Sequence, residues 1–344
     1  MFTNNISDYK LNSTIKTGKF GTLYKANYLN KNKCVVIKKI SVEQQADKLA
    51  MICEDVLKFR QFKHKNINTI LHCFVYKNYV YIVFPFMCFG DCQTLLENVF
   101  TSGFQGFPEI LIALIFKDIM CALMYIHSHH FVHGSLRAKN ILLDNNKAVL
   151  SNFRDSRSFI KQGKRDKVLY GSTVGKKENL NWTAPEILYQ NLYGYTEKSD
   201  LYSIGITSFE MANGFQPFMD SELTFMCTEK IRGNLPSLLD KSSQGSTSIH
   251  YSRDPVPGAM HNQRTFSDDF HQYIEICLNK NPTCRWSAQK LMTHSFFKQC
   301  RNSCISDQIK VLSFEFQRCI YVKDEPVRSA NVNVKHSDDV KWSF

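Results

Sequence analysis

The spacing of hydrophobic residues changes once along the chain, near residue 90. Before that point, apolar residues occur in short runs separated by turns, and residues 35–37 form a β-branched run that ends in two lysines. Short β-branched runs of this kind are typical of strands. We therefore expect strands between residues 8 and 40, and two more strands at residues 69–75 and 79–84.

One helix is expected within this first part. In residues 44–62, four apolar residues recur at helical spacing and would form one face: Val56, Leu57, Phe59 and Phe62. After residue 90 the apolar period is mostly helical. The helices expected there span residues 108–127, 199–213, 222–232, 267–279 and 287–294. A strand-rich small lobe followed by a helical large lobe is an α+β arrangement.

The domain boundaries follow from the same pattern. We expect one folded domain at residues 8–300, with an N-terminal lobe at about 8–88 and a C-terminal lobe at about 89–300. Residues 241–263 are rich in Ser, Gly, Pro and His, and a stretch with so little to bury predicts a flexible insert.

A polar tail is expected at residues 301–344. It ends in Trp342-Ser343-Phe344, two aromatic residues next to a stretch that forms a poor core. These aromatic residues are either accidental or anchors for a partner, because buried aromatic side chains dominate the hot spots of protein interfaces.

Composition and charge narrow the class of protein. The net charge of +12 indicates either a basic surface that aids solubility or a surface that binds an acidic partner. The chain has no run of five or more Lys/Arg, so we do not expect nucleic acid as a partner. The twelve cysteines lack Cys-x-x-Cys spacing and indicate reduced thiols rather than zinc ligands. No apolar signal core begins the chain, and the longest apolar run, residues 110–116, is too short to span a bilayer. We expect a cytosolic or nuclear protein without a membrane partner.

Two segments of the helical part resemble the signature of protein kinases. His133-Gly134-Ser135-Leu136-Arg137-Ala138-Lys139-Asn140 has the order of His-Arg-Asp-Leu-x-x-x-Asn, and Asn152-Phe153-Arg154 has that of Asp-Phe-Gly. Both aspartates are replaced, by Ser135 and Asn152. In kinases the first aspartate accepts the substrate hydroxyl proton and the second holds magnesium on the phosphates. The resemblance therefore implies a two-lobed protein-kinase fold that has lost kinase chemistry and holds no metal.

The replacements remove two contributions to catalysis. Ser135 cannot act as a general base near neutral pH, a role worth roughly 10²–10⁴ in rate. Asn152 lacks the charge that magnesium prefers, although the other expected metal ligand, Asn140, is present. If the lost metal costs a further ~3–4 kcal/mol, turnover falls by another two to three decades. We expect no enzyme activity, and the alternative is a weakly active serine/threonine protein kinase.

A glycine-containing segment extends the kinase resemblance toward the N-terminus. Residues 16–23 are similar to the loop Gly-x-Gly-x-x-Gly-x-Val, with Lys16 in place of the first glycine, and residues 35–38 are similar to Val-Ala-Ile-Lys. Lys38 would then contact nucleotide phosphates, paired with either Glu54 or Asp55. The expected nucleotide-binding residues are Ile15, Gly18, Gly21, Leu23, Val36, Lys38, Pro85, Met87, Asn140, Leu142 and Arg154.

Arg154 takes the place of the glycine in Asp-Phe-Gly. A fixed cation beside the phosphates can do part of the work of an absent metal, and Arg137, at the position of the catalytic-loop lysine, would add to this. We expect ATP to bind without magnesium and without hydrolysis. The alternatives are that Arg154 only pairs with an acid, or that the pocket is empty. Phe84 and Val36 are expected to narrow the adenine slot.

The structural motifs of the kinase fold are retained. Thr183-Ala184-Pro185-Glu186 matches Ala-Pro-Glu, and residues 200–205 resemble Asp-x-Trp-Ser-x-Gly. In kinases an arginine like Arg285 pairs with that glutamate, and residues like His133 and Phe153 stack between the lobes. The residues with an expected structural role are Asp55, His133, Phe153, Glu186, Asp200 and Arg285.

Longer blocks are similar to one branch of the kinase superfamily, the STRAD group of sterile-twenty-related adaptor pseudokinases. The similar blocks are residues 191–207, 211–214, 264–267 and 294–299. The family also has a polar insert before the third block, and its C-terminus, Trp-Glu-Phe, is similar to Trp342-Ser343-Phe344, with a serine in place of the glutamate. The resemblance covers about residues 8–300 and the last few residues.

The resemblance implies an allosteric activator. Members of this family bind a serine/threonine kinase of the liver-kinase-B type and, together with a helical-repeat scaffold of the MO-twenty-five type, hold that kinase active. Trp342 and Phe344 would dock on the scaffold. The second alternative is a signalling scaffold that activates nothing.

Overall fold

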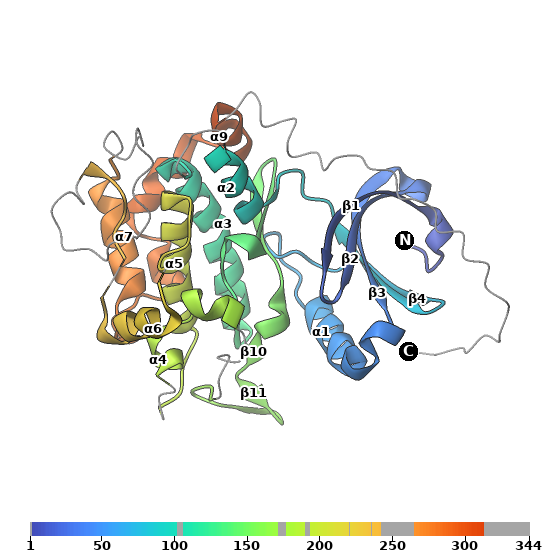
Figure 1. The fold of residues 1–344 in the computed structure, drawn as a ribbon, viewed down its shortest axis with the longest axis horizontal. Helices are drawn as coiled ribbons and strands as arrows, with labels where there is room; N and C mark the ends of the chain where they lie inside the picture. Colours follow the sequence, from blue (N-terminus) through green and yellow to red (C-terminus); the bar gives the residue numbers. More distant parts are fainter. Residues whose placement is uncertain are drawn as a thin grey trace.

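The first part of the chain folds into one antiparallel sheet of five strands, in the spatial order β1-β2-β3-β5-β4 (Figure 1). Along β3, Val35 and Ile37 are buried on one face of the sheet, in a cluster with residues of β1 and β2. Ile40 belongs to a second cluster on the other face, next to α1. The strands span Tyr9–Gly18 (β1), Gly21–Tyr28 (β2), Lys33–Ser41 (β3), His72–Tyr76 (β4) and Tyr79–Pro85 (β5).

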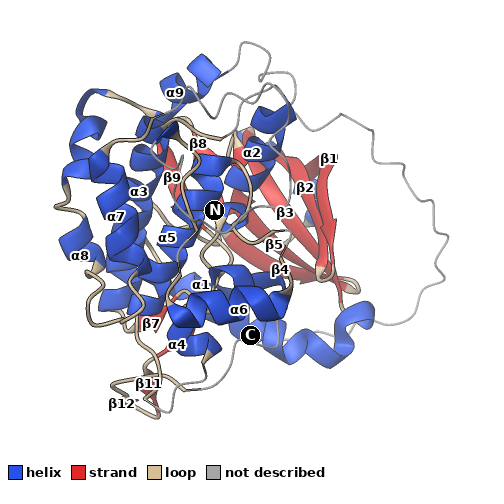
Figure 2. Cartoon of the chain, turned by 60° about the vertical axis from the view of Figure 1, so that its left-hand side comes forward, coloured by secondary structure: helices blue, strands red, loops and turns tan. Residues whose placement is uncertain are grey.

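This computed structural model describes residues 2–101, 106–170, 177–189, 193–219, 221–234, 236–241 and 265–312. Most of the predicted insert and the end of the tail, including Trp342 and Phe344, lie outside the described residues. The predicted α+β fold with a strand-rich first lobe and a helical second lobe is confirmed, as Figures 1 and 2 show.

The helix of the small lobe, α1 (Leu49–Gln61), follows a 3₁₀ segment at Glu43–Lys48. Ile52 of α1 is buried, and Val56 and Phe59 pack partly against the interior. These residues stand at i, i+4 and i+7, which defines one helical face. Leu57, predicted on that face, is 61 % exposed, so this part of the prediction is wrong, because one residue further along a helix is turned by about 100°.

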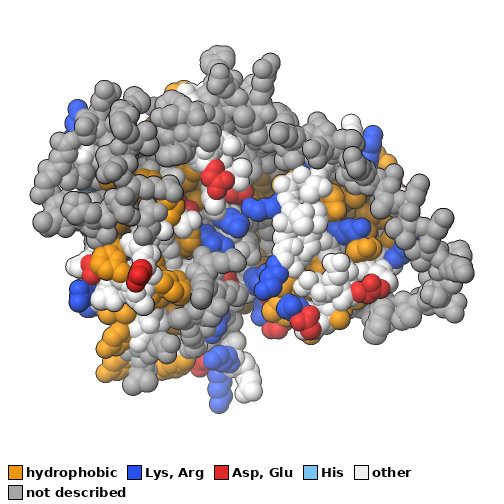
Figure 3. Space-filling model, viewed as in Figure 1, with side chains coloured by type: hydrophobic (Ala, Val, Ile, Leu, Met, Phe, Trp, Pro, Cys, Tyr) orange, Lys and Arg blue, Asp and Glu red, His pale blue; other side chains and the backbone are white. Residues whose placement is uncertain are grey.

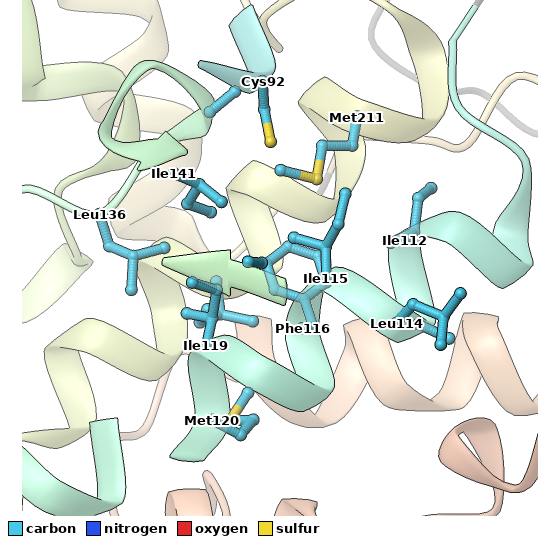
Figure 4. Close-up of a cluster of buried hydrophobic side chains, with 14 of the residues drawn as sticks. Cys92, Ile112, Leu114, Ile115, Phe116, Ile119, Met120, Leu136, Ile141 and Met211 are labelled. Atoms are coloured by element: carbon cyan, nitrogen blue, oxygen red, sulfur yellow. The ribbon is translucent and has the colours of Figure 1, made fainter. Parts of the chain in front are cut away.

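The large lobe is built around α3 (Glu109–Ser128), which is apolar on nearly all sides and passes through its centre (Figure 2). Figure 4 shows Ile115, Phe116 and Ile119 of this helix among side chains from other segments, including Leu136 and Met211. By length and hydropathy α3 could cross a membrane, but 61 % of its apolar window is buried inside the fold. Its composition is therefore explained by its place in the core.

The other elements of the second part of the chain complete the large lobe. The helices are α2 (Cys92–Thr101), α4 (Pro185–Leu188), α5 (Lys198–Asn213), α6 (Leu223–Arg232), α7 (Asp268–Leu278) and α8 (Ala288–Leu291). The short strands are β6 (Gly90–Asp91), β7 (Phe131–Val132), β8 (Ile141–Asp144), β9 (Lys147–Leu150), β10 (Arg157–Ser158), β11 (Ile160–Lys161) and β12 (Lys164–Arg165). Strand β8 lies between β6 and β9, and these strands bring the segments around Ser135 and Asn152 to the boundary between the lobes.

The folded domain continues past residue 300, where we expected the polar tail to begin. A further helix, α9 (Ile305–Leu312), places Ile305, Ile309 and Leu312 in the core cluster of the large lobe. These residues recur at i, i+4 and i+7. The apolar stripe is short and stands in an otherwise polar sequence, which is why the composition of the segment did not reveal it.

One buried ion pair joins two distant segments of the large lobe. Arg285 Nη1 and Nη2 donate to Glu186 Oε1 and Oε2 at 2.7 and 2.8 Å, and neither side chain is appreciably exposed. Arg285 also donates to the carbonyls of Asn279, Lys198 and Lys280. A buried pair of this kind is costly to break on one side, because the remaining charge has lost its partner.

Replacing Glu186 by alanine should therefore unfold the large lobe. We expect a loss of about 3–5 kcal/mol in the free energy of unfolding, measured by urea denaturation. The matched control is Glu54→Ala, which removes the exposed carboxylate that pairs with Lys58 on α1 and should leave the urea midpoint unchanged. Equal midpoints for Glu186→Ala and the unchanged protein would contradict a structural role for this pair.

Candidate functional site

A cavity of about 390 Å³ lies between the sheet and the large lobe. Such a volume is in the range of small-molecule sites. Nine of the predicted nucleotide-binding residues line it: Ile15, Leu23, Val36, Lys38, Pro85, Met87, Asn140, Leu142 and Arg154. Phe84 lines it as well. Figure 3 shows several Lys and Arg side chains, in blue, along the boundary between the two lobes.

Gly18 and Gly21, also predicted as nucleotide-binding residues, do not line the cavity. They face each other across the two-residue turn between β1 and β2. Gly21 has a φ of +110°, and a Cβ atom there would lie 2.2 Å from the Lys39 carbonyl oxygen. A glycine is thus required for close packing of this turn against β3, which explains the residue without a phosphate.

Lys38 lies on β3 with its amine buried in the cavity wall. Burial, and then the positive charge of Arg154, lower its pKa to about 8, whereas the charge of Asp55 acts in the opposite direction. Asp55 lines the cavity, but Glu54 points to solvent and pairs with Lys58 at 2.9 Å. Of the two carboxylates that the sequence left open, the structure places Asp55 at Lys38.

Arg154 is the second cation at this end of the cavity. It lies in a 3₁₀ turn, Phe153–Asp155, directly after Asn152, whose φ of +62° is in the left-handed region that asparagine tolerates. Arg154 Nε lies 3.6 Å from Asp55 Oδ2, and its guanidinium carbon lies 3.7 Å from the centre of the Phe20 ring. Arg137, expected to assist it, does not line this cavity; its guanidinium lies over the Trp182 ring at 5.4 Å.

Ser135, Asn140 and Asn152 form a chain of neutral hydrogen bonds where kinases have two aspartates. Asn152 Nδ2 donates to Asn140 Oδ1 at 3.1 Å, and Asn140 Nδ2 donates to Ser135 Oγ at 3.1 Å. The Asn140 oxygen that could bind a metal thus already accepts from an amide. Neutral amide oxygens without a carboxylate suit magnesium poorly, and no group of three His, Cys, Asp or Glu side chains suited to a metal ion occurs in the described part of the chain.

Two residues of this network were missed in the sequence. Asn179 Nδ2 donates to Ser135 Oγ at 3.2 Å and to Asp155 Oδ2 at 2.9 Å, so it joins three separate segments. No local pattern marks Asn179 or Asp155, because their contacts are set by the fold. Gly134 could have been noticed, since it stands where the kinase signature has arginine. Its φ is +70°, and a Cβ atom there would lie 2.8 Å from the Asp155 carbonyl oxygen.

His133 and Phe153, which we expected to stack between the lobes, are in contact edge to face. The rings of His133 and Phe153 are 4.9 Å apart, and the ring of Phe59 from α1 lies 5.6 Å from that of Phe153. Burial lowers the pKa of His133, whereas the charge of Asp200 acts in the opposite direction. Phe59 is a further residue that sequence reasoning assigned only to a helix face. This stack connects α1 to the segment that carries Ser135.

Asp200, assigned a structural role, anchors the same segment. Its two carboxylate oxygens accept the backbone N–H groups of His133 and Gly134 at 2.9 Å each, and one also contacts His127 Nε2 at 2.9 Å. The arrangement fixes the loop that carries Ser135.

The buried amine of Lys38 should make stability depend on pH. Its pKa rises from about 8 to an ordinary 10.5 on unfolding, so the unfolded state binds more protons between these pH values and stability rises with pH there. Lys38→Met should be more stable near pH 7, by on the order of 2–3 kcal/mol, and should lack this rise. Urea denaturation at pH 7 and 10 measures both effects.

Lys33→Met is the matched control, since Lys33 is exposed at the start of the same strand. We expect it to keep the pH dependence of the original protein. A Lys38→Met protein with an unchanged pH profile would show that the amine is well solvated.

Comparison with known proteins places this geometry in a family. The protein kinase domain family matches residues 9–297. The STE20-related kinase adapter protein alpha of Homo sapiens is 34 % identical over 303 residues, covering 81 % of this chain and 70 % of the relative. The alpha protein of Gallus gallus is 34 % identical over 80 % of this chain and 76 % of the relative. The beta protein of Homo sapiens is 30 % identical over 86 % of this chain and 77 % of the relative. The chain therefore belongs to the protein kinase domain family and, within it, to the STE20-related kinase adapter proteins.

Proposed function

We propose that this protein is a catalytically inactive kinase-fold adaptor, which binds a partner serine/threonine kinase of the liver-kinase-B type and activates it allosterically. The observation that carries the proposal is the neutral hydrogen-bond chain from Asn152 through Asn140 to Ser135. It fills the place of the groups that would deprotonate an alcohol and bind a divalent ion. The word "adapter" in the relatives' names agrees with a role in binding another kinase.

The chemistry of the chain explains why transfer of phosphate is not proposed. A serine hydroxyl at position 135 accepts hydrogen bonds from two amides but is too weak a base to take a proton from an alcohol at neutral pH. Asp155 is a carboxylate nearby, but it accepts from Asn179, which holds it beside Ser135 rather than over the cavity. Both features favour a structural role for Ser135 and Asp155 over a catalytic one.

The intact scaffold supports an allosteric role. The Phe59–Phe153–His133 contacts join α1 to the large lobe, and the Asp200 anchor and the Glu186–Arg285 pair hold segments of the large lobe together. A rigid body of this kind activates a partner when it binds the partner's active state more tightly than its inactive state, typically by ~1–3 kcal/mol. We propose that a helical-repeat scaffold of the MO-twenty-five type completes the complex through Trp342 and Phe344, in the cytosol or nucleus.

ATP is the proposed ligand of the cavity, bound without magnesium and without turnover. Lys38 and Arg154 would hold the phosphates, since both cations line one end of the cavity. The backbone groups of Pro85 and Met87 would hold the base, between apolar walls that include Val36 and Leu142. The donor set suits this ligand, because two cations and neutral amides favour phosphate oxygens over a metal ion.

Binding of ATP in excess EDTA should therefore stabilise the protein. At an ATP concentration of about 100 times Kd, the expected gain is about 2.7 kcal/mol, measured as a rise in the thermal midpoint. Arg154→Ala should lose most of this gain and keep the midpoint of the ligand-free protein. No rise with the original protein in EDTA would reject metal-independent nucleotide binding.

Reconstitution tests the activating role. Adding this chain and the helical-repeat scaffold to a candidate partner kinase should raise the partner's activity about 5- to 150-fold, the range of typical allosteric couplings. Deleting residues 342–344 should weaken binding to the scaffold. Recovery of the scaffold without a kinase would favour a non-activating scaffold, and phosphoryl transfer that is lost in Lys38→Ala would favour a weak kinase.

A further inference from the structure

Arg154 is held from two sides by segments far apart in the sequence. The Phe20 ring, at the tip of the turn between β1 and β2, lies against one face of its guanidinium, with 3.7 Å between the guanidinium carbon and the ring centre. Asp55 of α1 lies 3.6 Å from Arg154 Nε. Among the described residues no hydrogen bond occupies its two terminal amino groups, Nη1 and Nη2, and the edge that these two groups share is the outer edge of the guanidinium.

We propose that Phe20 is a positioning residue for phosphate, which fixes the Arg154 guanidinium so that its outer edge receives the phosphates of a nucleotide. The proposal rests on the nucleotide binding proposed above. It makes Phe20 a determinant of specificity for phosphorylated nucleotides over the bare nucleoside.

A stacked guanidinium suits this task. Its flat face is weakly hydrated and packs on an aromatic ring, while its N–H donors point outward in the plane of the group. Two N–H groups on that edge can donate to two phosphate oxygens at once, and such bidentate hydrogen bonds are strong. The stack and the phosphate therefore use different parts of Arg154 and do not compete. Because the side chain is already ordered, less conformational freedom is lost when the ligand binds.

The turn that carries Phe20 is itself fixed. Gly18 pairs with Gly21 across it, and Gly21 packs directly against the Lys39 carbonyl of β3. Gln45 Nε2 donates to the Lys19 carbonyl at 3.1 Å, which ties the turn to the segment before α1. Phe20 is therefore held over Arg154 by backbone contacts that do not depend on a ligand.

The charges at this end of the cavity favour an anion. Lys38 and Arg154 lie near the Asp55 carboxylate. The whole cavity lining carries Lys16, Lys25 and Lys139 as further cations, against one further carboxylate, Asp91. Adenosine lacks the groups that would meet these cations. If the Arg154 side chain is less ordered, the affinity for ATP should fall and the affinity for adenosine should stay the same. General misfolding would lower both affinities.

The test is isothermal titration of the full chain with ATP and with adenosine, both in EDTA. Phe20→Leu should lower the affinity for ATP roughly three- to thirtyfold, which is the effect expected when a desolvated cation–aromatic contact is lost. The affinity for adenosine should not change. Phe20→Trp should bind ATP like the original protein. The matched control is Phe86→Leu, which removes a ring at the base end of the cavity, where Lys25 lies 5.2 Å from its centre. It should weaken both ligands equally.

A double-mutant cycle assigns the effect to the stack. In an Arg154→Gln background, Phe20→Leu should cause no additional loss of ATP affinity; additive losses would overturn the proposal, as would a Phe20→Leu protein that loses adenosine as much as ATP. If the original protein binds ATP and Phe20→Leu binds it equally well, only the role of Phe20 is rejected. If the original protein binds neither ligand, the nucleotide site itself is rejected together with this role.

Discussion

The ionised carboxylate of Asp200 is the constraint on which the cleft depends. Burial alone would raise the pKa of this carboxyl, but the His127 hydrogen bond and charge, together with the charge of His133 and the Gly134 N–H, hold it below its ordinary value. A buried anion that satisfies two backbone donors fixes the loop from beneath. Ser135 and Asn140 are carried by that loop, and His133 stacks from it on Phe153. The bonds from Asp200 to this loop go to backbone N–H groups and do not involve the Ser135 side chain.

Buried acidic residues thus hold the large lobe together, whereas the neutral residues Ser135 and Asn152 stand where the kinase signature has aspartates. Asp200, Glu186 and Glu210 are all buried and hydrogen-bonded. Burial raises the pKa of Glu210 to about 7, against donation from the Ala138 N–H and the Trp182 indole. Losing one of these would leave buried donors unpaired, which costs stability. At the positions of the two signature aspartates, Asn152 Nδ2 donates to Asn140 Oδ1 and Asn140 Nδ2 donates to Ser135 Oγ, so the neutral side chains there have hydrogen-bond partners.

The sequence revealed those features that depend on order and spacing. The two lobes, the Lys38 strand, the Glu186–Arg285 pair and the replaced aspartates follow from motifs that are local in the chain. Features that depend on tertiary contact were missed or misassigned. Asn179 reaches Ser135 across 44 residues, and Gly21 owes its conformation to Lys39. The choice between Glu54 and Asp55 was open because adjacent helical residues differ only in which side of α1 they face, and that is settled by packing.

The glycine at position 134 has a consequence for control. With its Cβ position blocked by the Asp155 carbonyl, this place in the loop has no room for an arginine. Many kinases are switched on when a phosphorylated loop is captured by arginine side chains and becomes ordered. Here the Asn179 amide already donates hydrogen bonds to the Ser135 hydroxyl and to the Asp155 carboxylate. A phosphate added by an upstream kinase would therefore meet no arginine side chain at position 134.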